Sequence, residues 1–209
     1  LWLSDREEGR NIPVLSFKSK MNVIGRQVLE GIVESVARAE RDHRGLVIWQ
    51  DGPPFSAGAN LYQVAPSMLA GAFAELDGFV RAFQHMTRTL KYAKVPVVAA
   101  VNGMALGGGC EIVLHCARTV AALESYIGLV EVGVGLIPPG GGCKELALRA
   151  AEAAQFTANK DPFDFLQGAF STVAMATVSK SAHEARQLGF LRASDTIVMN
   201  PHELLHVAV

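Results

Sequence analysis

The sequence predicts an α/β domain, because short apolar segments that suit buried strands alternate with amphipathic segments that suit helices. The chain has 209 residues, and 50% of them are hydrophobic. It is therefore long enough to bury one sizeable core. Three segments rich in glycine or small residues follow or end the apolar elements, and we expect these loops to carry the chemistry.

The first half of the chain alternates between the two kinds of segment. Apolar side chains recur every three or four residues between residues 24 and 40, which is the spacing of an amphipathic helix. Residues 46–50 are a short apolar run that suits a buried strand, and the next four residues, Asp-Gly-Pro-Pro, force a turn. The other predicted elements of this half are a strand at 12–17, a helix at 72–92 and a strand at 95–101.

The second half continues the alternation after a run of glycines. Residues 112–116 suit either a short buried helix or another strand, and residues 118–123 suit a fourth strand. A glycine- and proline-rich loop at 133–142 precedes a helix at 144–154, and the polar residues 159–162 suit a further loop. The last predicted elements are a short helix at 183–188, a strand at 196–198 and a helix that starts at Pro201.

Composition and charge exclude several classes of function. The formal net charge is −1, so electrostatics give no reason to expect nucleic acid as the main partner. No apolar run approaches the ~20 residues of a membrane span. The start of the chain turns charged at once and shows no secretory signal. Its first residue is Leu rather than Met, which suggests a piece of a longer polypeptide.

Cysteine usage indicates a reducing compartment. The three cysteines, Cys110, Cys116 and Cys143, are odd in number and form no CxxC pair. We expect reduced thiols that mostly fill the core, and therefore a cytoplasmic protein.

Residues 101–111 are the most informative stretch. Gly107, Gly108 and Gly109 follow an apolar strand, and three glycines at such a junction let the backbone pass close to a ligand and present N–H groups to it. If a helix begins there, its positive end favours negative charge. Glu111, just inside the turn, is then either a helix-start acid or a catalytic acid or base.

Two further segments share this character. Residues 55–61 follow a predicted strand, and residues 131–142 begin with a second carboxylate, Glu131. Two loops that expose N–H groups can bind an oxyanion together, with Glu111 and Glu131 flanking the reacting atoms. This combination suits reactions through an enolate, either proton transfer beside a thioester carbonyl or addition of water across a conjugated double bond. Glu131 needs apolar surroundings to hold a proton near neutral pH, and its neighbours can supply them: Val130, Val132 and Val134.

These motifs, in this order, resemble the crotonase (enoyl-CoA hydratase/isomerase) superfamily. They read FSAGANL at 55–61, PVVAAVNGMALGGGCE at 96–111 and EVGVGLIPPGGG at 131–142. A weaker similarity to a later segment of the family lies at 181–189. The resemblance implies a ClpP/crotonase-like fold, in which repeated β-β-α spiral turns form two sheets surrounded by helices. We expect a single domain over 1–209, with a spiral core at 1–150 and a truncated helical C-terminal part at 151–209.

The resemblance also implies roles for individual residues. The backbone N–H groups of Ala59 and Gly108 match the pair that binds the thioester oxyanion. Glu111 and Glu131 match the two catalytic glutamates, which in family hydratases hold and activate water and deliver a proton. Because both are present, the resemblance favours a hydratase over an isomerase. The implied substrate is a coenzyme A thioester, with neither a cofactor nor a metal.

Coenzyme A has a predicted site of its own. The resemblance places the adenine end of coenzyme A near residues 18–22 and 59–62. Lys18 and Lys20 can pair with its phosphates. The matching residues are Lys18, Lys20, Met21, Asn60, Leu61 and Tyr62.

The sequence departs from the simple hydratases at several places. Asn60 stands where the family usually has Asp, and residues 151–166 look inserted. The chain ends before the family's closing helices. These features most resemble the hydratase portion of a multifunctional polypeptide that also carries a 3-hydroxyacyl-CoA dehydrogenase, whose strand-linked GxGxxG motif is absent here. The family also implies a homo-oligomer, either a trimer or a hexamer.

Other interpretations stay open at this point. An isomerase would depend mainly on Glu131, and a non-catalytic module would bind acyl-CoA without turnover. Residues 202–206 read HExxH, which is the signature of zinc proteases, but no third ligand follows and a terminal amphipathic helix is the simpler account. We interpret His115, which lies among apolar residues, as a core histidine. Ser56 has no evident His or Asp partner, which argues against a serine hydrolase.

Overall fold

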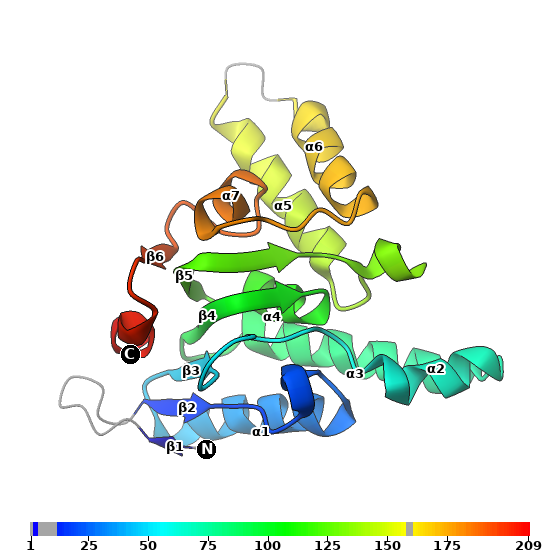
Figure 1. The fold of residues 1–209 in the computed structure, drawn as a ribbon, viewed down its shortest axis with the longest axis horizontal. Helices are drawn as coiled ribbons and strands as arrows, with labels where there is room; N and C mark the ends of the chain where they lie inside the picture. The colour runs from blue at the N-terminus through cyan, green and yellow to red at the C-terminus, as the bar shows by residue number, and fades with distance from the viewer. Residues whose placement is uncertain (1, 4–11, 158–160) are drawn as a thin grey trace.

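The computed structural model describes residues 2–3, 12–157 and 161–209. Six strands form one sheet in the order β1-β2-β3-β4-β5-β6 (Figure 1). Strands β1 and β2 pair antiparallel, and every later pair is parallel. The strands are β1 Trp2–Leu3, β2 Pro13–Leu15, β3 Leu46–Trp49, β4 Val97–Leu106, β5 Arg118–Gly128 and β6 Thr196–Val198.

Helices connect and cover the strands. The α-helices are α1 Arg26–Asp42, α2 Leu61–Leu69, α3 Phe73–Lys91, α4 Gly108–His115, α5 Gly142–Gln155, α6 Phe163–Ala174, α7 Ala182–Gln187 and α8 Leu204–Ala208. Three short 3₁₀ helices are η1 Lys20–Asn22, η2 Glu131–Val134 and η3 Pro201–Glu203. In the part of the chain that the structure describes, none of the helices combines the length and the apolar character that crossing a membrane requires.

Strand order explains where the loops gather. Strands that are neighbours in sequence are also neighbours in the sheet, and one or more helices lie between the members of each parallel pair from β2 onward. Parallel strands point the same way, so the carboxyl ends of β3, β4 and β5 lie along one edge of the sheet. The loops that follow these three strands include all three glycine-rich segments.

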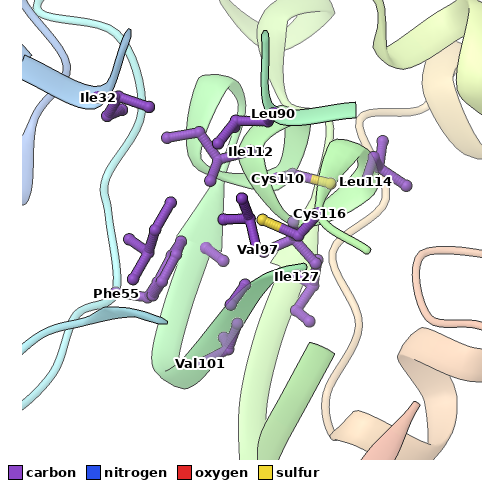
Figure 2. Close-up of a cluster of buried hydrophobic side chains, with 14 of the residues drawn as sticks. Ile32, Phe55, Leu90, Val97, Val101, Cys110, Ile112, Leu114, Cys116 and Ile127 are labelled. Atoms are coloured by element: carbon purple, nitrogen blue, oxygen red, sulfur yellow. The ribbon is translucent and has the colours of Figure 1, made fainter. Parts of the chain in front are cut away.

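The main core lies between the sheet and helices α1, α3 and α4. Figure 2 shows part of it, where side chains of α4 such as Ile112 and Leu114 approach Val97 of β4 and Ile127 of β5. Alternate strand residues face the other side of the sheet, where Val47, Ala100 and Val120 pack with α8. With apolar side chains on both faces, β3 and β4 are nearly continuous hydrophobic runs, as is typical of parallel sheets.

Strands β4 and β5 change register halfway, between Val101 and Gly103. Beyond that point the residues after β3 pair with β4 through a single bridge, Ser56 with Ala105, and Ile24 pairs with Ala59 in the same way. In the described residues, the second of the two sheets implied by the resemblance is therefore present as isolated bridges beside β4, beyond its change of register. The six named strands form one continuous sheet.

Helix α4 is short, and arginines fix its carboxyl end. The guanidinium of Arg149 donates to the carbonyl oxygens of Leu114, Gly189 and Phe190 at 2.8–3.0 Å. Arg192 donates to the carbonyl oxygens of Cys116 and Leu114. These cations satisfy carbonyls that the last helical turn leaves unpaired, and they lie at the negative end of the helix dipole.

Most of the predicted elements are confirmed, with changes at their ends. Residues 112–116, for which the sequence allowed either a helix or a strand, belong mainly to α4. Strand β5 continues five residues past the predicted 118–123. Of the predicted loop at 159–162, residues 159 and 160 lie outside the described part of the chain. The neighbouring residues 163–174, part of which looked inserted, form α6.

Helix α2 was missed, and its sequence explains why. Pro66 lies inside this nine-residue helix, where proline ordinarily argues against a helix. None of its residues is buried, so the usual apolar stripe toward a core is weak. The expectation that the thiols mostly fill the core is confirmed, because Cys110 and Cys116 are buried, whereas Cys143 is exposed at the start of α5.

We predict that Gly128→Ala destabilises the protein. A Cβ at this position at the end of β5 would lie 2.6 Å from the carbonyl oxygen of Thr177, so the backbone must shift. Forced repacking of this kind costs about 1–3 kcal/mol of the free energy of unfolding. Guanidinium denaturation measures the change.

Gly78→Ala is the matched control. Gly78 lies inside α3, and apart from the adjacent residues and backbone of its own helix no atom lies within 4 Å of the position that a methyl group would take there, so alanine should stabilise the helix by about 0.5–1 kcal/mol. Equal stability of the two variants would contradict the proposed clash at Gly128.

Candidate active site

The loops after β3, β4 and β5 enclose a cavity of about 390 Å³. Residues 57–59 follow β3, Gly107 and Gly108 follow β4, and Val130 and Glu131 follow β5. Both predicted glutamates and both predicted oxyanion donors line this one cavity. The rest of its wall is apolar and comes from α2, α3 and the loop before α5: Leu61, Val64, Met68, Leu76, Phe79, Val80, Phe83, Val134, Leu136, Ile137 and Pro139.

Strand pairing brings the two predicted donors together. The N–H of Ser56 donates to Met104 O, and the N–H of Leu106 donates to Ser56 O, so residues 57–59 run beside residues 106–108. A Cβ built on Gly108 would lie 3.5 Å from the nitrogen of Ala59. Within the described residues, neither the Ala59 N–H nor the Gly108 N–H donates a hydrogen bond. Both donors are therefore available to one acceptor in the cavity.

The glycine run is required by this close approach. Gly107 has φ of 53°, a left-handed conformation that favours glycine, and it turns the chain from β4 into α4. At Gly108, a Cβ would lie 2.5 Å from the ring of Phe83. Gly108 is the first residue of α4, so its N–H lies at the positive end of the helix dipole.

Glu111 lies in the first turn of α4 and is 0% exposed. Its Oε1 accepts a hydrogen bond of 2.8 Å from the N–H of Gly142, the first residue of α5, whereas Oε2 has no partner within the described residues. Burial, followed by the nearby carboxyl of Glu131, raises the pKa of Glu111 from 4.5 to about 8. The hydrogen bond from Gly142 and the nearby backbone of Gly140 oppose this rise. Glu111 is therefore mainly protonated at neutral pH.

Glu131 begins the 3₁₀ helix η2 and is 9% exposed. Burial raises its pKa above 4.5, and its Oε2 has no hydrogen-bond partner within the described residues. Val130 and Val134 line the cavity beside it, as expected. The expectation for Val132 was wrong, because it does not line this cavity but a separate groove between η2, α5 and α6.

Together these groups can perform proton transfer beside an oxyanion. Two carboxyls in one apolar site do not both ionise readily, so the pair tends to hold one proton as a unit. The ionised member can accept a proton and the neutral member can donate one. The Ala59 and Gly108 N–H groups can stabilise negative charge that develops on a carbonyl oxygen.

Sequence reasoning missed the apolar wall of the cavity. Of the residues on α2 and α3 that form it, only Leu61 was singled out, and for coenzyme A rather than for the cavity. The signal in α3 is present, since Leu76, Phe79, Val80 and Phe83 recur at helical spacing. A cluster around His115 was also missed. This side chain is buried, as expected of a core histidine, but it contacts Lys144 and Glu145.

Of the six residues predicted to hold coenzyme A, one lines the cavity and the others lie outside it. Leu61 lines the cavity, and the carbonyl of Met21 accepts a hydrogen bond from the N–H of Ala57. Asn60 precedes α2, where its N–H donates to Ile24 O, and Tyr62 is 94% exposed. The other two, Lys18 and Lys20, have exposed side chains near η1. Their binding of coenzyme A stays a prediction.

The HExxH segment does not form a metal site in this structure. His202 lies in η3 and His206 in α8, and both side chains are exposed. Over residues 12–157 and 161–209, no three His, Cys, Asp or Glu side chains gather as metal ligands would. The segment is instead a terminal helix whose Leu204 and Ala208 pack on the sheet.

Comparison with known sequences gives a consistent result. The sequence model of a family described as enoyl-CoA hydratase/isomerase matches residues 7–190. A "Probable 3-hydroxyacyl-CoA dehydrogenase" of Bacillus subtilis is 42% identical over 200 residues, which cover 96% of this chain and 25% of that protein. An enoyl-CoA isomerase/hydratase of Mycosarcoma maydis is 34% identical over 142 residues, covering 66% of this chain and 49% of the relative. The chain thus spans a quarter to a half of the length of these relatives.

Solved structures share the fold. The crystal structure of an enoyl-CoA hydratase from Bacillus anthracis superposes with a TM-score of 0.75 at 23% sequence identity. The match covers 95% of this chain and 70% of the other. The expected crotonase fold is therefore confirmed.

We predict that Glu111→Gln reduces the pH dependence of stability. Because folding raises the pKa of Glu111 from 4.5 to about 8, the folded state keeps a proton that the unfolded state releases between these pH values. The free energy of unfolding should therefore fall as pH rises from about 4.5 to 8 and level off above 8. One such group contributes a slope of at most about 1.4 kcal/mol per pH unit.

Urea denaturation at several pH values between 4.5 and 9 measures this slope. Glutamine retains an oxygen for the Gly142 N–H but carries no proton, so Glu111→Gln should be stabilised relative to the original chain as pH rises. Glu152→Gln, which removes an exposed carboxylate of α5, should follow the original chain. Parallel curves for Glu111→Gln and the original chain would show that Glu111 does not hold the proton.

Proposed function

The chain belongs to the enoyl-CoA hydratase/isomerase family, and from this premise we propose that it adds water to a trans-2-enoyl-CoA to give a 3-hydroxyacyl-CoA, a step of fatty-acid β-oxidation. The observation that carries the proposal is the pair of unused N–H groups, on Ala59 and Gly108, in the same cavity as two carboxyls of raised pKa.

The N–H pair suits the charge that forms in this reaction. When the oxygen of water attacks C3 of a conjugated thioester, negative charge moves onto the thioester oxygen as an enolate. Two fixed backbone donors in an apolar cavity stabilise that oxygen without reorganising, and loss of one such donor typically costs about 3 kcal/mol of barrier. The apolar wall excludes water from the donors and strengthens the effect.

The two glutamates can supply the proton movements. The ionised carboxyl of the pair takes a proton from water as the oxygen bonds to C3, and the protonated carboxyl gives its proton to C2. The pair begins and ends with one proton between its members, so the net change is the addition of one water molecule. General acid–base catalysis of this kind typically contributes a factor of about 10²–10⁴ in rate.

We also propose that this chain is the hydratase portion of a multifunctional polypeptide. The support is the 42% identity to a relative whose name is that of a 3-hydroxyacyl-CoA dehydrogenase and of which the chain matches 25%. A hydratase and this dehydrogenase catalyse consecutive steps, because the product of the first is the substrate of the second. We further propose a cytoplasmic homo-oligomer, a trimer or hexamer, that needs no cofactor or metal besides its coenzyme A thioester.

A second candidate function is enoyl-CoA isomerisation. It is favoured by the difference between the two carboxyls, because Glu111 is fully buried with one oxygen tied to Gly142, whereas Glu131 keeps some exposure. A single carboxylate can move a proton from C2 to C4 of a 3-enoyl thioester. In that case Glu131 alone would be essential.

We predict that Glu111→Gln and Glu131→Gln each lower the kcat for hydration of crotonyl-CoA by at least about 100-fold. Each substitution removes one member of the proton-transferring pair and leaves the N–H donors in place. The loss of absorbance of the conjugated thioester follows the reaction, with crotonyl-CoA and longer trans-2-enoyl-CoAs as substrates.

Glu124→Gln, an exposed carboxylate of β5, serves as the control and should retain the original rate. A 3-enoyl-CoA substrate separates the two candidates, since an isomerase would lose activity with Glu131→Gln only. Binding of acyl-CoA by the original chain without turnover of any of these substrates would contradict both enzymatic proposals.

A further inference from the structure

We propose that one face of α3 positions the carboxyl group of Glu111 by holding the loop at residues 139–142. This positioning face consists of Gln84, Thr87 and Lys91, which recur at the three- and four-residue spacing that places side chains on one side of a helix. The inference rests on the proposed role of Glu111 in catalysis.

Both oxygens of the Glu111 carboxyl face this loop. Oε1 accepts the hydrogen bond from Gly142, and a Cβ on Gly140 would lie 2.5 Å from Oε2. The same Cβ would also lie 2.5 Å from the ring of Phe83, so the loop is wedged between the carboxyl and α3. A small movement of the loop must therefore change the surroundings of both oxygens.

Two members of the positioning face bind the loop directly. The buried hydroxyl of Thr87 lies 2.6 Å from Gly140 O and 3.2 Å from Gln84 O, so its single proton is donated to the loop. Nε2 of Gln84 donates to Pro139 O at 2.9 Å. Successive carbonyls of the loop are thus tied to successive turns of α3.

Lys91 holds the other end of the loop through Glu145. Glu145 lies in the first turn of α5 and is 1% exposed, and Lys91 Nζ lies within 2.7 Å of both its carboxylate oxygens. Burial opposes ionisation of Glu145, but hydrogen bonds from Lys91 and Lys144 outweigh it and lower its pKa. Because the N–H of Glu145 donates to Gly141 O, this ion pair fixes the turn that presents the Gly142 N–H.

His115 lies on the same helix as Glu111 and also contacts the loop. Its Nδ1 lies 2.7 Å from Glu111 O, and since a carbonyl can only accept, Nδ1 carries the proton. Burial lowers the pKa of His115 to about 4, so the ring is neutral and Nε2 accepts from Lys144 Nζ at 3.4 Å. A Cβ on Gly141 would lie 3.0 Å from Nε2, so the loop also packs against this ring.

The positioning face acts through Glu111 and not on the substrate. Gln84, Thr87 and Lys91 do not line the cavity, whereas Phe83, their neighbour on α3, does. Displacing a catalytic group by about 1 Å can cost a factor of about 100 in rate. Loosening the loop should therefore lower kcat while leaving substrate binding largely intact.

The test compares two threonines of the same helix. Thr87→Val keeps the shape of the side chain but removes the donor to Gly140 O, and we expect kcat to fall about 10–100-fold while KM changes less than about threefold. Thr89→Val is the matched control, because the one partner of the Thr89 hydroxyl among the described residues is His85 O, within α3 itself. Thr87→Ser, which keeps the hydroxyl, should restore most of the activity.

A second readout needs no substrate. Carbon-13 NMR of the glutamate carboxyls gives the pKa of Glu111, which should rise in Thr87→Val because the Gly142 N–H that lowers it is held less firmly. The substitution leaves unchanged the titratable groups near Glu111, namely Glu131 of η2, Cys143 and Glu145 of α5, and Cys110 and His115 of α4.

The outcomes separate this inference from the proposed function. An active original chain whose kcat and Glu111 pKa are both unchanged by Thr87→Val would overturn the positioning role. An inactive original chain would refute the proposed hydratase activity. The carboxyl titration would still decide whether α3 positions the carboxyl group of Glu111. If Thr87→Val does not fold, Gln84→Leu, at an exposed position, takes its place with an expected loss in kcat of a few-fold, and an unchanged kcat would again overturn the inference.

Discussion

The candidate site depends on the hydrogen bonds between the segment after β3 and the second half of β4. Because Ser56 pairs with Ala105, the chain on either side of this bridge runs in parallel until Ala59 lies beside Gly108. Both proposed oxyanion donors are backbone groups, so their separation is set by strand pairing and not by side-chain rotamers. The strand that makes this pairing, β4, leads directly into α4, whose first turn carries Glu111.

Two carboxyls in a largely apolar cavity are costly unless they stay neutral or find partners. Among the described residues, Glu111 Oε1 has a hydrogen-bond partner, whereas Glu111 Oε2 and Glu131 Oε2 have none. Buried polar atoms without partners are rare in stable proteins, and they tend to occur where a protein binds or transforms something. The structure thus combines a tightly held backbone frame with two acids whose proton affinity is raised.

The sequence predicted the order of strands and helices and the four residues at the centre of the site. The structure brings those four residues to one cavity, because glycines and carboxylates carry strong local signals and the carboxyl ends of parallel strands meet at one edge. The sequence could not show the part of the cavity wall that α2 supplies, since α2 contains Pro66 and lacks a clear apolar stripe. Nor could it show that Thr87, Lys91 and Glu145 meet around residues 140–142, because these contacts join residues more than 50 positions apart.

The guanidinium groups at the end of α4 link distant parts of the chain. Arg149 of α5 bonds Leu114 O together with Gly189 O and Phe190 O, so one side chain joins the helix of Glu111 to the turn after α7. An eight-residue helix is too short to persist by itself in water, and most of its persistence must come from such tertiary contacts. Opening of the segment near residue 190 would release α4 as well, so the amide protons of the two regions belong to one cooperative unit of hydrogen exchange.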